Sequence, residues 1–265
     1  MLIGSPPKPA PEGQPFAFGV IADPHLAVTL PDREERLRTA LACCADAECA
    51  FAVICGDVFE NWDERCIHTL RRALQEEFGR AVGLVPGNHD VGNKPGLAGQ
   101  ITQEARMRWV DAFGGDRWSF DYAGRRYIGI NNVLLGSGLP AEEEQNAWLE
   151  EQLTTGAVVF AHYPFFLQKP DEPRQEYWTV DEPARSRFLD TATRHGVAAV
   201  FTGHLHRDRR VVLDGRIHAT TPATSFSCDP DPTLVGYRIV RASAQGLSDE
   251  MHRLPPGVYN PPQAG

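Results

Sequence analysis

The chain contains five nearly unbroken apolar runs, and segments with helical spacing of apolar residues lie between several of them. The runs occupy residues 16–23, 51–57, 81–90 with its loop, 157–164 and 197–206. Continuous hydrophobic stretches of this kind are typical of strands that are buried on both faces of a sheet. We therefore expect a sheet core of five buried strands, with helices in the intervening segments.

The clearest helical pattern covers residues 32–48, where Leu37, Leu41 and Cys44 recur at helical spacing and Asp32 is the expected N-cap. Glycines at 79 and 196 favour helix ends. Further helices are expected over residues 63–79, 101–113, 140–153 and 184–195.

Turn and breaker residues define the remaining elements. Ala123-Gly124 and Asp214-Gly215 predict two hairpins. Two short strands are expected near 224–227 and 235–241. Residues 1–15 hold five prolines and predict a disordered or loosely attached arm, and residues 254–265 predict a loose Pro-rich tail. Without repeats or an internal linker, residues 16–253 are expected to form one domain.

Polar side chains of the types that bind metals follow all five runs. The segment LVPGNHD (84–90) alone fits a turn after a buried strand as well as it fits a metal or phosphate site. The recurrence of the pattern favours the site, because ligands collect outside the carboxyl ends of strands in open α/β sheets. The residues are Asp23, His25, Asp57, Asn88, His89, His162, His204 and His206. The other histidines, at 68, 195, 218 and 252, are expected to be structural or solvated.

The chemistry of this set indicates two metal ions. Imidazoles, carboxylates and one amide oxygen suit Mn²⁺, Fe²⁺/Fe³⁺ or Zn²⁺. A structural zinc would use four nitrogen or sulfur ligands in a closed tetrahedron. Here the ligands exceed the need of one ion, and no cysteine is among them. Two ions about 3.5–4 Å apart that share a carboxylate would use the whole set.

Composition narrows the class of partner. The formal net charge of −9 argues against a nucleic acid, whose phosphates favour basic surfaces. It leaves a phosphate ester substrate open, because bound cations reverse the local charge. The six cysteines form no C-x-x-C pair and read as buried thiols in a reducing compartment. Without a signal peptide or an apolar run near 20 residues, we expect a cytoplasmic protein with no membrane partner. The oligomeric state stays open.

In order, the motifs D-x-H (23–25), G-D (56–57), G-N-H-D (87–90), His162 and G-H-x-H (203–206) resemble the five blocks of the calcineurin-like metallophosphoesterases. The resemblance covers roughly residues 16 to 240 and implies an α/β fold, a four-layer α/β/β/α sandwich. It places one metal on Asp23, His25, Asp57 and His206. It places the other on Asp57, Asn88, His162 and His204, so that Asp57 bridges. Short matches such as VGNKP and AHYPFFL also resemble the calcineurin-like phosphoesterase domain-containing subfamily, which includes protein Ser/Thr phosphatases.

The resemblance implies a metal-dependent phosphoric ester hydrolase. A metal-bound hydroxide would attack a phosphomonoester, with Asn88 and His89 contacting the substrate. His89 resembles the family's general acid, and Asp90 would orient it. The alternative for His89 is a further ligand or a turn residue. Alternative functions are a phosphodiesterase, for cyclic nucleotides or glycerophosphodiesters, and a non-catalytic scaffold of the same fold.

Two departures from related groups matter. Glu60 stands where purple acid phosphatases carry a tyrosine ligand, and GDVFENWDE lacks the arginine of the phosphoprotein phosphatase block. No phosphate-clamping arginine is therefore assigned. Arg207 could contact phosphate or be solvated. The loop over residues 163–183 could wall the substrate cleft or pack its aromatic residues on the sheet.

Overall fold

The fold is that of a computed structural model, which describes residues 2–4, 7 and 9–259. Within these residues, two six-stranded mixed sheets lie face to face. The first sheet contains, in spatial order, β1 (Leu2–Ile3), β4 (Val82–Val85), β3 (Ala52–Cys55), β2 (Phe16–Ile21), β11 (Gly236–Ser243) and β12 (Gly246–Arg253). Strands β2, β3 and β4 are parallel, and β1, β11 and β12 each run antiparallel to a neighbour.

The second sheet is built in a similar way. Its spatial order is β5 (Trp118–Tyr122), β6 (Arg125–Gly129), β7 (Val158–Phe160), β8 (Ala199–Thr202), β10 (Arg216–Thr220) and β9 (Arg209–Leu213). Strands β6, β7, β8 and β10 are parallel, while β5 and β9 close the two edges as hairpin partners. Both hairpins predicted from the sequence are present.

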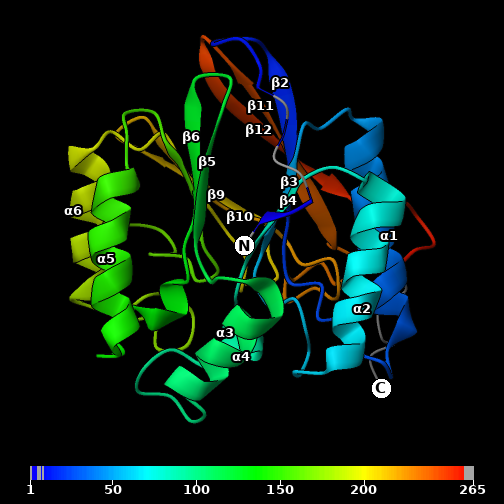
Figure 1. Ribbon diagram of the computed structural model, residues 1–265, viewed down its shortest axis with the longest axis horizontal. Helices are drawn as coiled ribbons and strands as arrows, with labels where there is room; N and C mark the ends of the chain where they lie inside the picture. The colour runs from blue at the N-terminus through cyan, green and yellow to red at the C-terminus, as the bar shows by residue number, and fades with distance from the viewer. Residues whose placement is uncertain (1, 5–6, 8, 260–265) are drawn as a thin grey trace.

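Helices cover the outer face of each sheet. Figure 1 shows α1 (Pro31–Asp46) and α2 (Glu64–Ala73) on one side of the sheets, and α5 (Pro140–Gln152) and α6 (Ala184–Arg194) on the other. The predicted four-layer α/β/β/α sandwich is therefore confirmed. The shorter elements are the π-helical turn η1 (Leu74–Phe78), α3 (Asn88–Val91), α4 (Gln103–Phe113) and the 3-10 turn η2 (Asn132–Leu134). Among the described residues, no helix combines the length and hydrophobicity that a membrane span requires.

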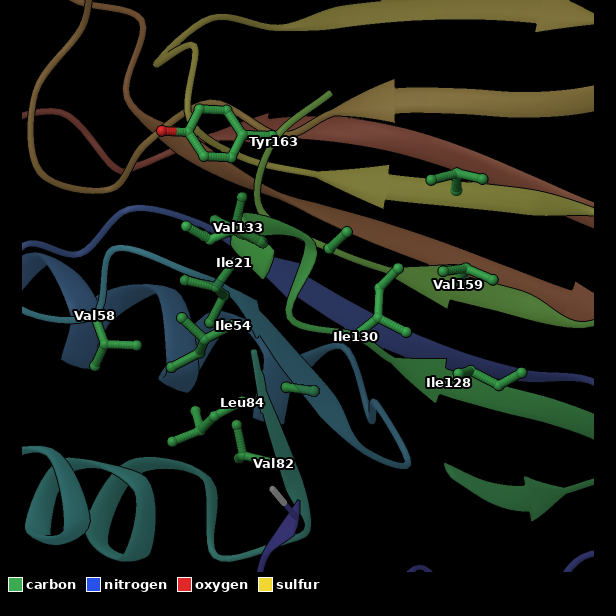
Figure 2. Packing of buried hydrophobic residues seen from close by; sticks show 14 of the residues in the cluster. Ile21, Ile54, Val58, Val82, Leu84, Ile128, Ile130, Val133, Val159 and Tyr163 are labelled. Carbon is green, nitrogen blue, oxygen red and sulfur yellow. The ribbon is translucent and has the colours of Figure 1, made fainter. Parts of the chain in front are cut away.

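Strand alternation divides the apolar residues between two kinds of core. In β2, Phe18 and Val20 face the space between the sheets, while Ala17 and Ile21 face the helices. Phe18 and Phe51 stack between the sheets with ring centroids 5.0 Å apart. The outer layers contain aliphatic residues from both sheets, including Ile21, Ile54, Leu84, Ile128, Ile130 and Val159 (Figure 2).

Some boundaries differ from the sequence-based expectations. Asp32 is not the N-cap of α1, because the helix begins at Pro31 and the Asp32 carboxylate pairs with Arg36 one turn later. Residues 224–227 are a loop. Strand β12 was missed because it is a partly exposed edge strand without a hydrophobic run.

The two termini are less loose than predicted. In the arm, Leu2 and Ile3 pair with β4. In the tail, Leu254 is buried, and the Tyr259 ring lies under the Arg36 guanidinium at 4.5 Å. The expectation of a loose segment is therefore wrong for these residues. Residues 1, 5–6, 8 and 260–265 lie outside the described part.

Candidate metal centre

The carboxyl ends of strands from both sheets meet at one buried centre. The loops after β2, β3, β4, β7 and β8 supply the seven residues predicted as ligands, and each is at most 6% exposed. They are Asp23, His25, Asp57, Asn88, His162, His204 and His206. Six of them form two compact groups, one with Asp23, His25 and His206 and one with Asp57, His162 and His204.

The backbone at five of these positions is left-handed. The φ angles are 50° at Asp23, 47° at His25, 46° at Asp57, 72° at His204 and 51° at His206. Such angles are uncommon outside glycine and cost about 1–2 kcal/mol each. Adjacent hydrogen bonds hold them, including His25 N–H to the Asp57 carbonyl at 2.9 Å.

Glycines in the motifs make room for these ligands. A Cβ at Gly87 would overlap the Asp57 carboxylate and backbone. A Cβ at Gly203 would lie 2.5 Å from Asp23 Oδ2, and one at Gly56 would overlap the His162 ring. The glycine of each motif is therefore required by the close approach of a ligand from another strand.

In the first group, two imidazole nitrogens face each other. The Nε2 atoms of His25 and His206 are 3.1 Å apart. His206 Nδ1 is 3.0 Å from the Phe226 carbonyl, and His25 Nδ1 is 3.1 Å from the Glu60 carboxylate. The Phe226 carbonyl is an acceptor, so the hydrogen of His206 lies on Nδ1 and its Nε2 presents a lone pair toward His25. Two imidazole nitrogens that face each other beside a carboxylate suit a cation between them.

Asp57 of the second group also faces the first group. Asp57 Oδ2 is 3.6 Å from His25 Nε2, while Asp57 Oδ1 is 3.3 Å from His162 Nε2. Asn88 Oδ1 is 2.9 Å from the same His162 nitrogen. The two carboxylate oxygens of Asp57 therefore face different ligand groups, which is the arrangement that a carboxylate shared by two ions requires.

Backbone carbonyls fix two further histidines in this group. His162 Nδ1 donates to the Cys55 carbonyl at 2.9 Å, which directs Nε2 into the centre. His204 Nε2 donates to the Tyr177 carbonyl at 3.0 Å, which leaves its Nδ1 as the lone-pair nitrogen. Fixing the tautomer in this way is typical of residues that hold metal ligands in place.

The electrostatics of the centre reflect buried charge. Burial raises the pKa of Asp23 well above its usual value, with Asp57 adding to the effect. Burial also opposes ionisation of Asp57, but His162 beside it lowers the Asp57 pKa well below the usual value. Burial lowers the pKa of His206 to about 3, and the neighbouring His25 adds to the fall. A neutral imidazole is the form that binds metal, and divalent cations would favour both ionised carboxylates.

His89 lies at the edge of the centre. Its ring is 4.6 Å from that of His25, and its backbone N–H donates to Asp57 Oδ1 at 2.8 Å. His89 Nδ1 is 2.7 Å from the Glu60 carbonyl, so that Nδ1–H donates and Nε2 is left for other partners. His89 is partly exposed, as contact with a substrate requires.

The orienting role predicted for Asp90 is wrong. Its carboxylate accepts backbone N–H groups from Val58, Phe59 and Gly87 at 3.1, 3.0 and 2.8 Å. It is fully buried, and burial raises its pKa to about 7, with Asp57 adding to the rise. Asp90 therefore joins the loops after β3 and β4, and the Glu60 carbonyl orients His89 instead.

The sequence reasoning missed this use of Glu60 and its partner Arg33. Arg33 Nη1 donates to the Glu60 carboxylate at 2.5 Å and to the His25 carbonyl at 3.0 Å. The one sequence feature that could have indicated a role for Glu60 is its position three residues after Asp57. Arg207 is exposed and donates through Nε to the Cys228 carbonyl at 2.6 Å.

Comparison with known proteins agrees with this geometry. Residues 16–208 match the family described as Calcineurin-like phosphoesterase. Serine/threonine-protein phosphatase CPPED1 of Rattus norvegicus is 33% identical over 220 residues, covering 77% of this chain and 68% of the rat protein. The human protein of the same name is 29% identical over 221 residues, with the same coverage.

Solved structures with the same fold are more distant in sequence. A dimetal phosphatase from Danio rerio superposes with a TM-score of 0.63 at 15% identity, covering 91% of this chain and 99% of that one. The purple acid phosphatase PPD1 of yellow lupin gives 0.66 at 15% identity, covering 96% and 53%. At these identities the likeness supports the fold alone.

Fold, site and sequence relatives together define a phosphoric ester hydrolase with a dinuclear metal centre. The chain belongs to the calcineurin-like phosphoesterase family.

Proposed function

We propose that the protein is a phosphomonoesterase that acts on phosphoserine or phosphothreonine in proteins. The observation that carries the monoesterase proposal is the placement of His89, which lies beside both ligand groups with Nδ1 held by the Glu60 carbonyl. A proton donor at this position assists departure of an alkoxide, the leaving group of a serine or threonine ester. The rat and human relatives are named as serine/threonine-protein phosphatases, which supports a protein substrate.

The side chains have separable tasks. Two divalent cations held there would supply Lewis acidity toward the phosphoryl oxygens and a water nucleophile near neutral pH. Asp57 would hold both ions, and Asn88 would contact the phosphoryl group beside the second ion. His89 would donate a proton from Nε2 to the leaving oxygen, while the Glu60 carbonyl accepts from Nδ1 and stabilises the imidazolium.

The ligand types support manganese, iron or zinc as the native metals, because imidazole and carboxylate together suit borderline ions. All six cysteines are free thiols, which supports a reducing compartment such as the cytoplasm.

The function is tested with a substrate panel on manganese-loaded protein. Phosphoserine and phosphothreonine peptides, nitrophenyl phosphate and bis-nitrophenyl phosphate are compared by kcat/KM. We expect turnover of the peptides and of the monoester above that of the diester. A clear preference for the diester would replace the proposal with a phosphodiesterase, and metal-loaded protein inert to every ester would indicate a scaffold.

The role of Asp57 is tested by Asp57→Asn. We expect this variant to lose both metal occupancy and turnover, because one carboxylate faces both ligand groups. Metal content by mass spectrometry and nitrophenyl phosphate hydrolysis measure the two losses. Two bound ions with full activity would contradict the bridging role.

A further inference from the structure

Tyr177 contacts the second ligand group from a distant part of the loop that also carries His162. It belongs to the long loop between β7 and α6, the segment 163–183. Its hydroxyl is 3.3 Å from Asn88 Nδ2, and its carbonyl accepts from His204 Nε2 at 3.0 Å. Its ring also lies 4.7 Å from that of His204. One residue of this loop therefore contacts two of the side chains placed at the second metal position.

Both contacts act on the orientation of a ligand. An asparagine that binds metal must turn its oxygen inward, and the outward NH₂ then needs an acceptor. The Tyr177 hydroxyl is that acceptor for Asn88. The Tyr177 carbonyl holds the hydrogen of His204 on Nε2 and so keeps the Nδ1 lone pair available.

The loop that carries Tyr177 is itself anchored. Lys94 Nζ donates to the Thr179 carbonyl at 2.6 Å, and Val180 N–H donates to the Pro164 carbonyl at 3.0 Å. Trp178, the next residue after Tyr177, is 40% exposed, with its ring 6.0 Å from that of His204. Tyr177 thus points inward from a defined loop whose next side chain faces solvent beside the centre.

We propose that Tyr177 is a positioning residue that couples the conformation of the 163–183 loop to occupancy of the second metal position. The inference rests on the dinuclear centre of the proposed function. Because coupling between two equilibria is reciprocal, a loop that favours binding of the second ion must itself be stabilised when that ion binds. The 163–183 loop is then more stable when the second ion is bound than when it is absent.

The first test is Tyr177→Phe, which removes the hydroxyl and keeps the ring and the carbonyl. Manganese affinity is measured by competition with a chelator. We expect about 10- to 100-fold weaker binding of one manganese equivalent and unchanged binding of the other. The matched control is Tyr127→Phe, because the Tyr127 hydroxyl is buried between the sheets without a hydrogen-bond partner.

The second test measures the loop directly. Arg174 lies in the loop with its side chain 57% exposed, so trypsin can cut between Arg174 and Gln175. In the natural protein, saturating manganese should slow this cut, as followed by mass spectrometry. In Tyr177→Phe, manganese bound at the first position alone should leave the rate close to that of the metal-free protein.

The role of Tyr177 and the presence of a dinuclear centre can fail separately in these experiments. Unchanged affinity for both equivalents in Tyr177→Phe, or an equal loss of both, would overturn the positioning role. If the rate of cleavage after Arg174 in the natural protein were the same with and without manganese, the coupling between loop and metal would be overturned. If the natural protein failed to bind a second equivalent, the dinuclear centre itself would be refuted.

Discussion

At the scale of single residues, main-chain atoms hold much of the site. The carbonyls of Cys55, Tyr177 and Phe226 each accept from a histidine at the centre. The Glu60 carbonyl does the same for His89. Because a carbonyl is present whatever the side chain, substitutions at these positions that preserve the backbone should leave the histidine tautomers unchanged.

Replacing His89 with alanine separates proton donation from metal binding. His89→Ala should keep two manganese ions, since His89 is not one of the seven proposed ligand residues, and should lose on the order of 10²–10⁴ in kcat. The loss should be larger for alkyl phosphates than for nitrophenyl phosphate, whose leaving group needs little protonation. Steady-state kinetics on both esters, with metal content as the control, make the comparison. An equal loss on the two esters would remove the proton-donor role.

The site residues differ in how far the sequence could identify them. The seven ligand-type residues were predictable because each follows a buried strand, and the carboxyl ends of strands are where ligands collect. The meeting of β2, β3 and β4 of the first sheet with β7 and β8 of the second is a property of the folded chain. The role of Asp90 was not predictable, because its partners are backbone groups of residues 58, 59 and 87, which only the folded chain brings together. The contacts of Tyr177 depend on the path of a long loop, which residue patterns do not specify.

At the scale of elements, the 163–183 loop is also packed against the second sheet. Its Phe166 lies with its ring 4.7 Å from that of His218 on β10. His218 Nε2 is buried without a hydrogen-bond partner, and burial lowers the His218 pKa from 6.5 to about 4, with Arg216 adding to the fall. Protonation of this histidine therefore opposes the packing of the loop on β10.

The pH dependence of stability should reflect His218. Between pH 6.5 and 4 the unfolded chain binds a proton at this residue that the folded chain does not, so its contribution is present above pH 6.5 and is lost as the pH falls toward 4. The loss amounts to up to about 3 kcal/mol. His218→Phe, compared with the natural sequence in chelator, should show a smaller fall in Tm from pH 6.5 to 4.5. Parallel Tm curves would contradict this.

Elements were predictable where burial repeats regularly. The core strands and the long helices follow from apolar runs and helical spacing. The helix predicted over residues 63–79 ends at Gly79, whose backbone is left-handed. The GNHD segment was expected as a loop but begins the short helix α3, since four residues are too few to show a period. Strand β12 pairs with β11 along its full length through its backbone, which side-chain patterns do not reveal.

At the scale of the whole molecule, Trp118 joins the two sheets. It lies on β5 opposite Gly129 of β6, and its Nε1 donates to the Leu84 carbonyl of β4 at 2.8 Å. A Cβ at Gly83 or at Gly129 would overlap the indole ring. The ring therefore occupies space that glycines from both sheets leave open.

A single methyl group tests this packing. Gly129→Ala should destabilise the protein by roughly 1–3 kcal/mol, because the indole cannot move aside within the close-packed space between the sheets. Urea unfolding measures the change. The matched control is Gly115→Ala, where the nearest atom would be 3.6 Å away in ordinary contact. Equal midpoints for the two variants would contradict the fit of Trp118 across the glycines.

The left-handed backbone at Asp23, His25, Asp57, His204 and His206 has a consequence for selection. Glycine or asparagine would adopt these angles with less strain, so a lineage that no longer needed hydrolysis would gain stability by drifting toward them. Selection for a rigid binding platform alone would favour the loss of backbone strain at these five positions first. An aspartate or a histidine at each of these positions therefore keeps a strained backbone together with a side chain of a type that binds metal.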